Sequence, residues 1–184
     1  MQRPEDVRLT IPVPHSTTAT AGAASAFLLR RIAYRAGAYA PGIQEHLFFE
    51  LQQQGIGGSI ESVGEWFKRT VGSLQEIGYR FSGRRVAERT PGILAWVREG
   101  AGYRGAVLPA SYKKLHSGNG EDVAPYAVGL GIDRIDGAAK DDLVLVDPWP
   151  GVGKPDRVTV PPALESAHRE GNYHALIFYW AGWA

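Results

Sequence analysis

The chain of 184 residues is long enough to bury a hydrophobic core, and its 44% hydrophobic and 21% charged residues are typical of a globular protein. A formal net charge of +1 favours neither nucleic acid nor an anionic membrane as a partner. The absence of cysteine excludes disulfides, thiolate metal sites and a cysteine nucleophile. We expect a single domain over residues 1–184.

We expect no targeting segment, cofactor site or metal site in this chain. No apolar run approaches the roughly 20 residues that span a bilayer, and the polar segment 1–6 does not resemble a signal peptide. We therefore expect a cytoplasmic protein. The glycine-rich segments 55–58 and 151–153 lack the pattern of a phosphate loop, so we expect no cofactor. Four histidines lack metal-binding spacing and are predicted to be structural or surface residues rather than metal ligands: His46, His116, His168 and His174.

The chain begins with an extended segment followed by a helical pattern. Residues 1–20 are predicted to be extended, and alternating apolar side chains over 7–11 suggest a short strand. Residues 21–36 have an apolar face at helical spacing. We expect Thr20 to be the N-cap of this helix and Gly37 to end it.

Further helical stripes follow, so residues 21–100 are predicted to be mainly helical. The stripes predict helices at 42–54, 59–78 and 90–100. Ser59 and Thr90 are the expected N-caps of the last two helices. Between these two helices, a connection around Gly83 contains four arginines: Arg80, Arg84, Arg85 and Arg89. They form either a solvated loop or a docking patch for an acidic peptide or a carrier protein.

Residues 101–184 are predicted to be mainly strand. Short β-branched or aromatic segments, separated by Gly, Pro and Asp, predict strands at 103–109, 125–132, 142–147, 156–160 and 173–180. A short helix is expected at 161–170. Helices followed by mostly consecutive strands indicate an α+β fold, with an N-terminal helical layer packed on a C-terminal antiparallel sheet.

Three local patterns occur in an order typical of one enzyme family. The segment TAGAAS at 20–25 opens the first long helix, and His15 precedes Ala21 by six residues. The segments PYAVGLGID and VLVDPWPG follow at 125–133 and 144–151. In order and spacing, these patterns resemble the papain-like cysteine peptidases, in particular the branch that processes bacteriocin leaders.

The resemblance implies a papain-like fold with a groove that has lost its peptidase chemistry. In that family, an oxyanion-hole Gln lies six residues before a nucleophilic Cys at a helix mouth. A His opens a later strand, and an Asp of an Asp-Pro pair orients it. The resemblance places His15 at the Gln, Ala21 at the Cys, Pro125 or Tyr126 at the His, and Asp147 at the Asp. Alanine cannot attack a carbonyl carbon, and neither Pro nor Tyr can act as the base at neutral pH.

Three hypotheses for function follow from this resemblance. In the first, the degenerate domain, a pseudoenzyme, binds a peptide or peptide-like biosynthetic intermediate in its former cleft. In the second, a non-cysteine enzyme of bacterial specialised metabolism carries out acyl transfer, cyclisation or proton transfer, with His15 and Asp147 as its acid–base pair. In the third, a cysteine peptidase has been inactivated by a Cys-to-Ala change at residue 21.

The resemblance also implies which residues meet the ligand. The partner would be a peptide, a carrier-bound group or a small molecule, and not nucleic acid or a membrane. The oligomeric state does not follow from the sequence. The residues expected to line the cleft are His15, Thr20, Ala21, Gly22, Tyr126, Asp147 and Trp149.

Overall fold

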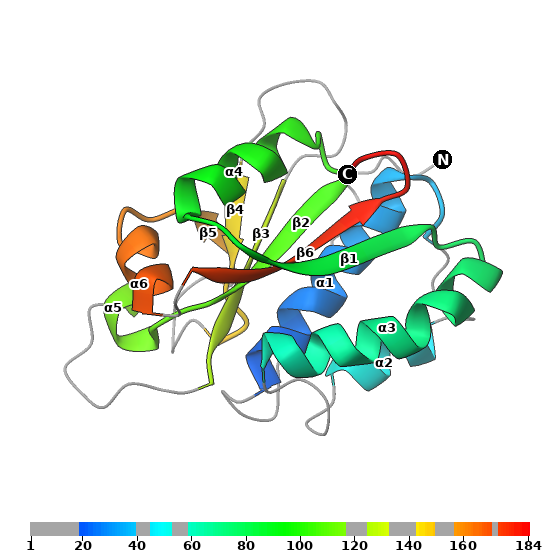
Figure 1. Ribbon diagram of the computed structural model, residues 1–184, viewed down its shortest axis with the longest axis horizontal. Helices are drawn as coiled ribbons and strands as arrows, with labels where there is room; N and C mark the ends of the chain where they lie inside the picture. Colours follow the sequence, from blue (N-terminus) through cyan, green and yellow to red (C-terminus); the bar gives the residue numbers. More distant parts are fainter. Residues whose placement is uncertain are drawn as a thin grey trace.

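A computed structural model describes residues 19–39, 45–52, 59–116, 125–132, 143–149, 157–170 and 173–184. It confirms an α+β fold, in which helices cover both faces of a six-stranded antiparallel sheet (Figure 1). The helices are α1 (Thr20–Arg35), α2 (Glu45–Gln52), α3 (Ile60–Glu76), α4 (Thr90–Glu99), α5 (Tyr112–His116) and α6 (Leu164–Glu170). The strands are β1 (Phe81–Ala87), β2 (Arg104–Pro109), β3 (Ala127–Ile132), β4 (Leu143–Val146), β5 (Arg157–Thr159) and β6 (His174–Trp180). The strand suggested at 7–11 lies outside the described residues.

The sheet separates two hydrophobic cores. Its strand order is β1-β6-β2-β3-β4-β5, and every neighbouring pair is antiparallel. In β6, Leu176 and Phe178 lie in the core with α1 and α3, whereas Ala175 and Ile177 lie in the core with α4. We expected one helical layer, but α4 packs on the face opposite α1. Because both faces are covered, every residue of β3 and β4 is buried.

Helix α1 lies close to the sheet because the residues at this contact are small. A β-carbon added at Gly105, Gly129 or Gly131 would lie 3.3, 3.1 or 2.9 Å from a terminal carbon of Leu28. One added at Gly129 would also lie 3.5 Å from the β-carbon of Ala24. The alanines and glycine at the start of α1 are therefore consistent with close helix–sheet packing, whatever the site does.

Of the three predicted N-caps, the structure confirms one, and the other two predictions were wrong. Ser59 is the N-cap of α3, and its hydroxyl accepts a hydrogen bond from the Ser62 N–H at 3.2 Å. The predictions for Thr20 and Thr90 were wrong, because each is the first residue inside its helix. Their hydroxyls bond instead to a strand and to a histidine of α6, respectively, so tertiary contacts replace the caps.

Two elements were not predicted. Residues 81–87, expected within a connecting loop, form the edge strand β1 and pair with β6 along its whole length. Gly83 and the adjacent Arg84 and Arg85 interrupt the hydrophobic alternation, so the pairing with β6 decides the conformation here. The five residues of α5 are too few to show a helical period.

A buried histidine joins α6, α4 and β6. His168 is fully buried, and its Nε2 lies 2.8 Å from the His174 carbonyl oxygen. A carbonyl oxygen only accepts, so Nε2 carries the proton and Nδ1 accepts from the Thr90 hydroxyl at 2.8 Å. Burial lowers the pKa of His168 below its ordinary value, and the hydrogen bond to the His174 carbonyl only partly opposes this effect.

The neutral state of His168 predicts that the chain loses stability in mild acid. The unfolded chain takes up a proton at this residue near pH 6.5, whereas the folded chain resists it. The free energy of unfolding should therefore decrease as pH falls from about 6.5 towards the lowered pKa. Urea unfolding across this range measures the slope, and His168→Gln should flatten it. The partly exposed His174→Gln is the control, and an equal flattening there would contradict the assignment.

Candidate functional site

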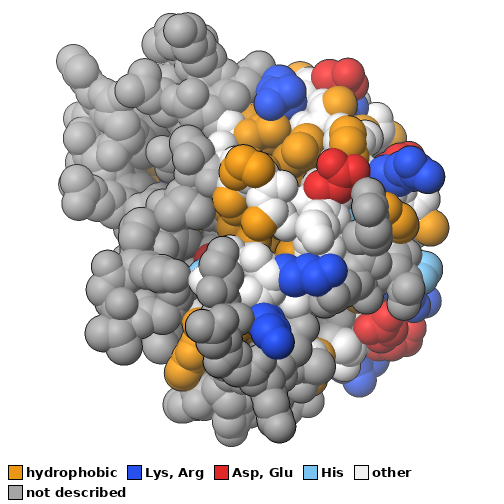
Figure 2. All heavy atoms as spheres, turned by 90° about the vertical axis from the view of Figure 1, so that its left-hand side faces the viewer, with side chains coloured by type: hydrophobic (Ala, Val, Ile, Leu, Met, Phe, Trp, Pro, Cys, Tyr) orange, Lys and Arg blue, Asp and Glu red, His pale blue; other side chains and the backbone are white. Residues whose placement is uncertain are grey.

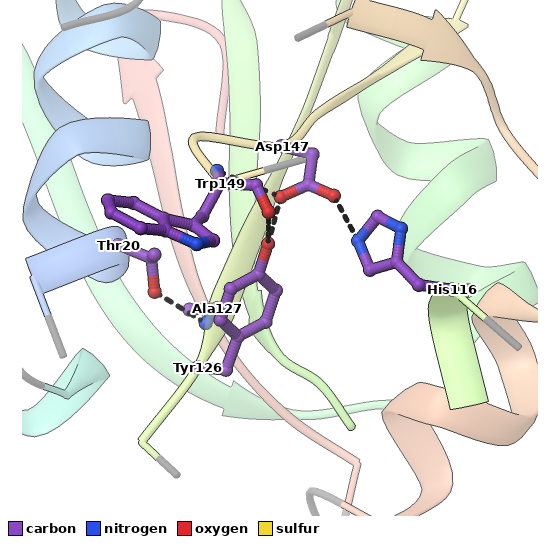
Figure 3. Close-up of polar contacts among 6 residues, drawn as sticks. All are labelled: Thr20, His116, Tyr126, Ala127, Asp147 and Trp149. Atoms are coloured by element: carbon purple, nitrogen blue, oxygen red, sulfur yellow. Dashed lines mark hydrogen bonds and ion pairs between the residues drawn. The ribbon is translucent and has the colours of Figure 1, made fainter. Parts of the chain in front are cut away.

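The start of α1, the start of β3 and the end of β4 meet at one end of the sheet. Thr20 is the first residue of α1, and its Oγ1 accepts a hydrogen bond from the Ala127 N–H at 2.9 Å. Asp147 directly follows β4, which pairs with β3. Tyr126 directly precedes β3 and reaches Asp147 through its hydroxyl. The sheet thus brings together residues far apart in the sequence (Figure 3).

The Asp147 carboxylate is the centre of a buried polar cluster. Its Oδ1 accepts hydrogen bonds from the Tyr126 hydroxyl and, at 3.2 Å, from the Trp149 N–H. Its Oδ2 lies 2.7 Å from His116 Nε2. The single O–H of Tyr126 is shared with the Trp149 carbonyl oxygen, which lies 3.1 Å from the hydroxyl oxygen. Only 3% of Asp147 is exposed, so these groups replace the water that a carboxylate would otherwise hold.

Tyr126 acts as a hydrogen-bond donor in this cluster. Burial, and then the negative charge of Asp147, raise the pKa of Tyr126 far above its ordinary value. The phenol therefore stays protonated over the pH range in which a protein is folded. Sequence reasoning left Pro125 and Tyr126 as alternatives here. Pro125 is exposed, whereas Tyr126 is buried and contacts Asp147.

His116 is the residue of this site that sequence reasoning missed. It ends α5, and its side chain is only 12% exposed. Its ring packs against Tyr112, with ring centroids 4.3 Å apart, and Tyr112 packs edge-on against Tyr126. His116 Nε2 is close enough to Asp147 for an ion pair, although the ring N–H does not point squarely at the carboxylate. The short α5 carries no sequence signal that relates it to Asp147.

The expected cleft residues that the structure describes lie at this end of the sheet, but most of them are buried. Thr20, Ala21 and Gly22 are buried at the start of α1, and Ala21 packs within the core between α1 and the sheet. Trp149 is partly exposed and extends towards the start of α1 (Figure 3). His15 lies outside the described residues, so its proposed pairing with Asp147 stays a prediction.

A small pocket lies elsewhere, between the second half of α1 and the sheet. Its lining is mainly apolar and includes Leu28, Ile132 and Val146. Arg31 lies at this pocket and donates to the Ile132 carbonyl at 3.2 Å. Leu28 and Arg31 lie in the other half of α1 from Thr20, and none of His116, Tyr126, Asp147 and Trp149 lines the pocket, although Val146 directly precedes Asp147.

The part of the chain that the structure describes contains no group of three or more His, Asp or Glu side chains placed to hold a metal ion. Within the same residues, no helix combines the length and apolarity needed to cross a membrane. A scan against protein-family models found no match, and searches of curated proteins and of solved structures found none either.

Proposed function

We propose that this chain is a cytoplasmic, papain-like protein without peptidase chemistry, which binds a peptide or peptide-like biosynthetic intermediate beside Trp149. The contact between Tyr126 and Asp147 carries the proposal. Tyr126 is one of the two positions, with Pro125, that the resemblance offers for the base, and Asp147 is the position it assigns to the orienting acid. Their direct contact, next to the start of the first long helix, supports that alignment.

The same contact argues against hydrolysis at this site. Ala21, at the proposed nucleophile position, offers no atom that could attack a carbonyl carbon. Tyr126 stays protonated and donates a hydrogen bond to Asp147, so it cannot accept a proton from a nucleophile. An orienting acid without a base and a nucleophile does not perform acyl transfer.

The buried pair has a second effect, which is to fix Trp149. Asp147 accepts from the Trp149 N–H, and Tyr126 donates to the Trp149 carbonyl, so both backbone polar groups of this residue are held. These bonds hold the backbone of Trp149, and its partly exposed indole packs against the core that includes Tyr126. Both contacts lower the ordering cost for a ligand that stacks on the indole. In this proposal, the former catalytic pair positions an aromatic binding platform.

Binding without turnover tests the proposal. Hexapeptide libraries, each with one fixed position, would be incubated with the protein and followed by native mass spectrometry and by the mass of the free peptides. We expect noncovalent complexes, unaltered peptides and a loss of binding in Trp149→Ala. Trp183→Ala is the control, because this partly exposed tryptophan follows β6 at the opposite end of the sheet. Absent complexes, cleaved peptides or equal losses in both variants would each overturn the proposal.

The contact between His116 and Asp147 favours a second candidate function. A histidine 2.7 Å from a buried carboxylate is an arrangement that can transfer protons. The chain would then be a non-cysteine enzyme, with His116 as the acid–base residue in place of the expected His15. In the same incubations, a change in ligand mass or structure that disappears in His116→Gln would favour this enzyme over the binding protein.

A further inference from the structure

The edge strand β1 has a pairing side that no described strand occupies. It pairs with β6 over all seven of its residues, and it is the last strand of the sheet in that direction. A strand at a sheet edge presents backbone N–H and C=O groups that another extended chain can pair with. The edge can therefore accept a further strand.

The basic residues of this segment lie along the same edge. Arg80, Arg84, Arg85 and Arg89 are all exposed. Arg85 lies 3.1 Å from Glu61, and both side chains are about half exposed, so this ion pair is weak. Arg80 and Arg84 have no acidic partner among the described residues. The acid that follows the strand, Glu88, accepts instead from the Arg89 backbone N–H at 2.9 Å.

The basic side chains lie on both faces of the sheet along β1. On the side of the molecule that carries α5 and α6, the basic side chains in view are interspersed with acidic, hydrophobic and other side chains (Figure 2). Along β1, successive side chains alternate between the faces of the sheet, so Arg84 and Arg85 project to opposite sides. A chain added at this edge would therefore meet a positive charge on each face.

We propose that β1 binds an extended acidic peptide segment as an added strand. Backbone pairing would hold the segment, and Asp or Glu side chains at neighbouring positions would meet Arg84 and Arg85. A second copy of β1 fits less well, because antiparallel pairing about the strand centre would place Arg84 of one copy directly opposite Arg84 of the other. This surface is separate from the Trp149 platform, and the inference stands without the function proposed there.

Peptide binding and amide exchange together test the inference. The probes are two fluorescein-labelled peptides, one alternating Glu with Val and the other alternating Lys with Val. Fluorescence anisotropy should show that only the acidic probe binds, with an affinity that falls as salt is added. Arg84→Glu combined with Arg85→Glu should weaken binding about tenfold or more. The control is Arg69→Glu combined with Arg98→Glu, an equal charge change at exposed helical positions.

Hydrogen exchange decides whether the peptide forms a strand. On binding, alternate backbone amides of Phe81–Ala87 should gain protection, because only every second N–H points away from β6. Binding without that protection, binding by the basic probe, or equal weakening in the control would overturn the inference. If the free protein self-associates, and Arg84→Glu combined with Arg85→Glu abolishes this self-association, then the edge binds a second copy of the chain and the inference is wrong. Trp149→Ala should leave binding of the acidic peptide unchanged. This result would distinguish a failure of the inference about β1 from a failure of the function proposed for the Trp149 platform.

Discussion

Asp147→Ala is expected to destabilise the folded chain by about 3 kcal/mol, within the range for breaking a buried, hydrogen-bonded charge cluster. The substitution removes the acceptor for the Tyr126 hydroxyl and the Trp149 N–H, and it leaves His116 Nε2 buried without its carboxylate. The Tyr126 hydroxyl keeps the Trp149 carbonyl as an acceptor, so part of the cluster survives. Urea unfolding at neutral pH, followed by circular dichroism, measures the loss.

A double-substitution cycle assigns that loss to the contact rather than to the shape of the side chain. Asp147→Asn keeps the size and one oxygen acceptor, so it should cost less than Asp147→Ala. Tyr126→Phe removes only the hydroxyl. If the two groups act together, Asp147→Asn and Tyr126→Phe should couple by about 1 kcal/mol or more. Additive effects would show that Tyr126 and Asp147 do not act together. An Asp147→Ala variant as stable as the unsubstituted chain would show that the cluster contributes nothing to stability.

Leu28→Ala is expected to cost about 4 kcal/mol, in the upper part of the range for removing a buried leucine side chain. Leu28 is 2% exposed, and its terminal carbons lie over Gly105, Gly129 and Gly131. Glycines have no side chain that could move into the space, so the cavity should persist. Chemical denaturation provides the measurement, and a cost near 1 kcal/mol would mean that the helix collapses onto the sheet.

The matching experiment fills the same space from the sheet side. Gly131→Ala alone should destabilise, because its new methyl would lie 2.9 Å from Leu28 Cδ2. In the Leu28→Ala background that clash is absent and the methyl occupies part of the cavity. The double variant should therefore be more stable than the sum of the two single effects predicts, by about 1 kcal/mol. Leu29→Ala with Gly131→Ala is the control and should be additive. Among the described residues, and apart from the chain neighbours of Gly131, Leu28 is the only side chain within 4 Å of that methyl position.

The sequence by itself determined most of the regular structure. The apolar stripes of α1, α3 and α4 and the β-branched segments of β2, β3, β4 and β6 predicted these elements to within a few residues. Their order predicted an antiparallel sheet within an α+β fold. These features can be predicted from the sequence because they depend on the period of hydrophobic residues along a short segment. The Asp-Pro pattern also directed attention to Asp147, which the structure places in a buried polar cluster.

The tertiary structure alone decided the features that depend on distant partners. Thr90 bonds to His168, 78 residues further along the chain, instead of capping its own helix. Residues 81–87 become a strand because β6 pairs with them, and α4 buries the second face of the sheet. His116 joins Asp147 because α5 follows β2 while Asp147 follows β4. Hydrogen bonding and charge pairing act through space, so no local pattern in the sequence encodes which residues they bring together.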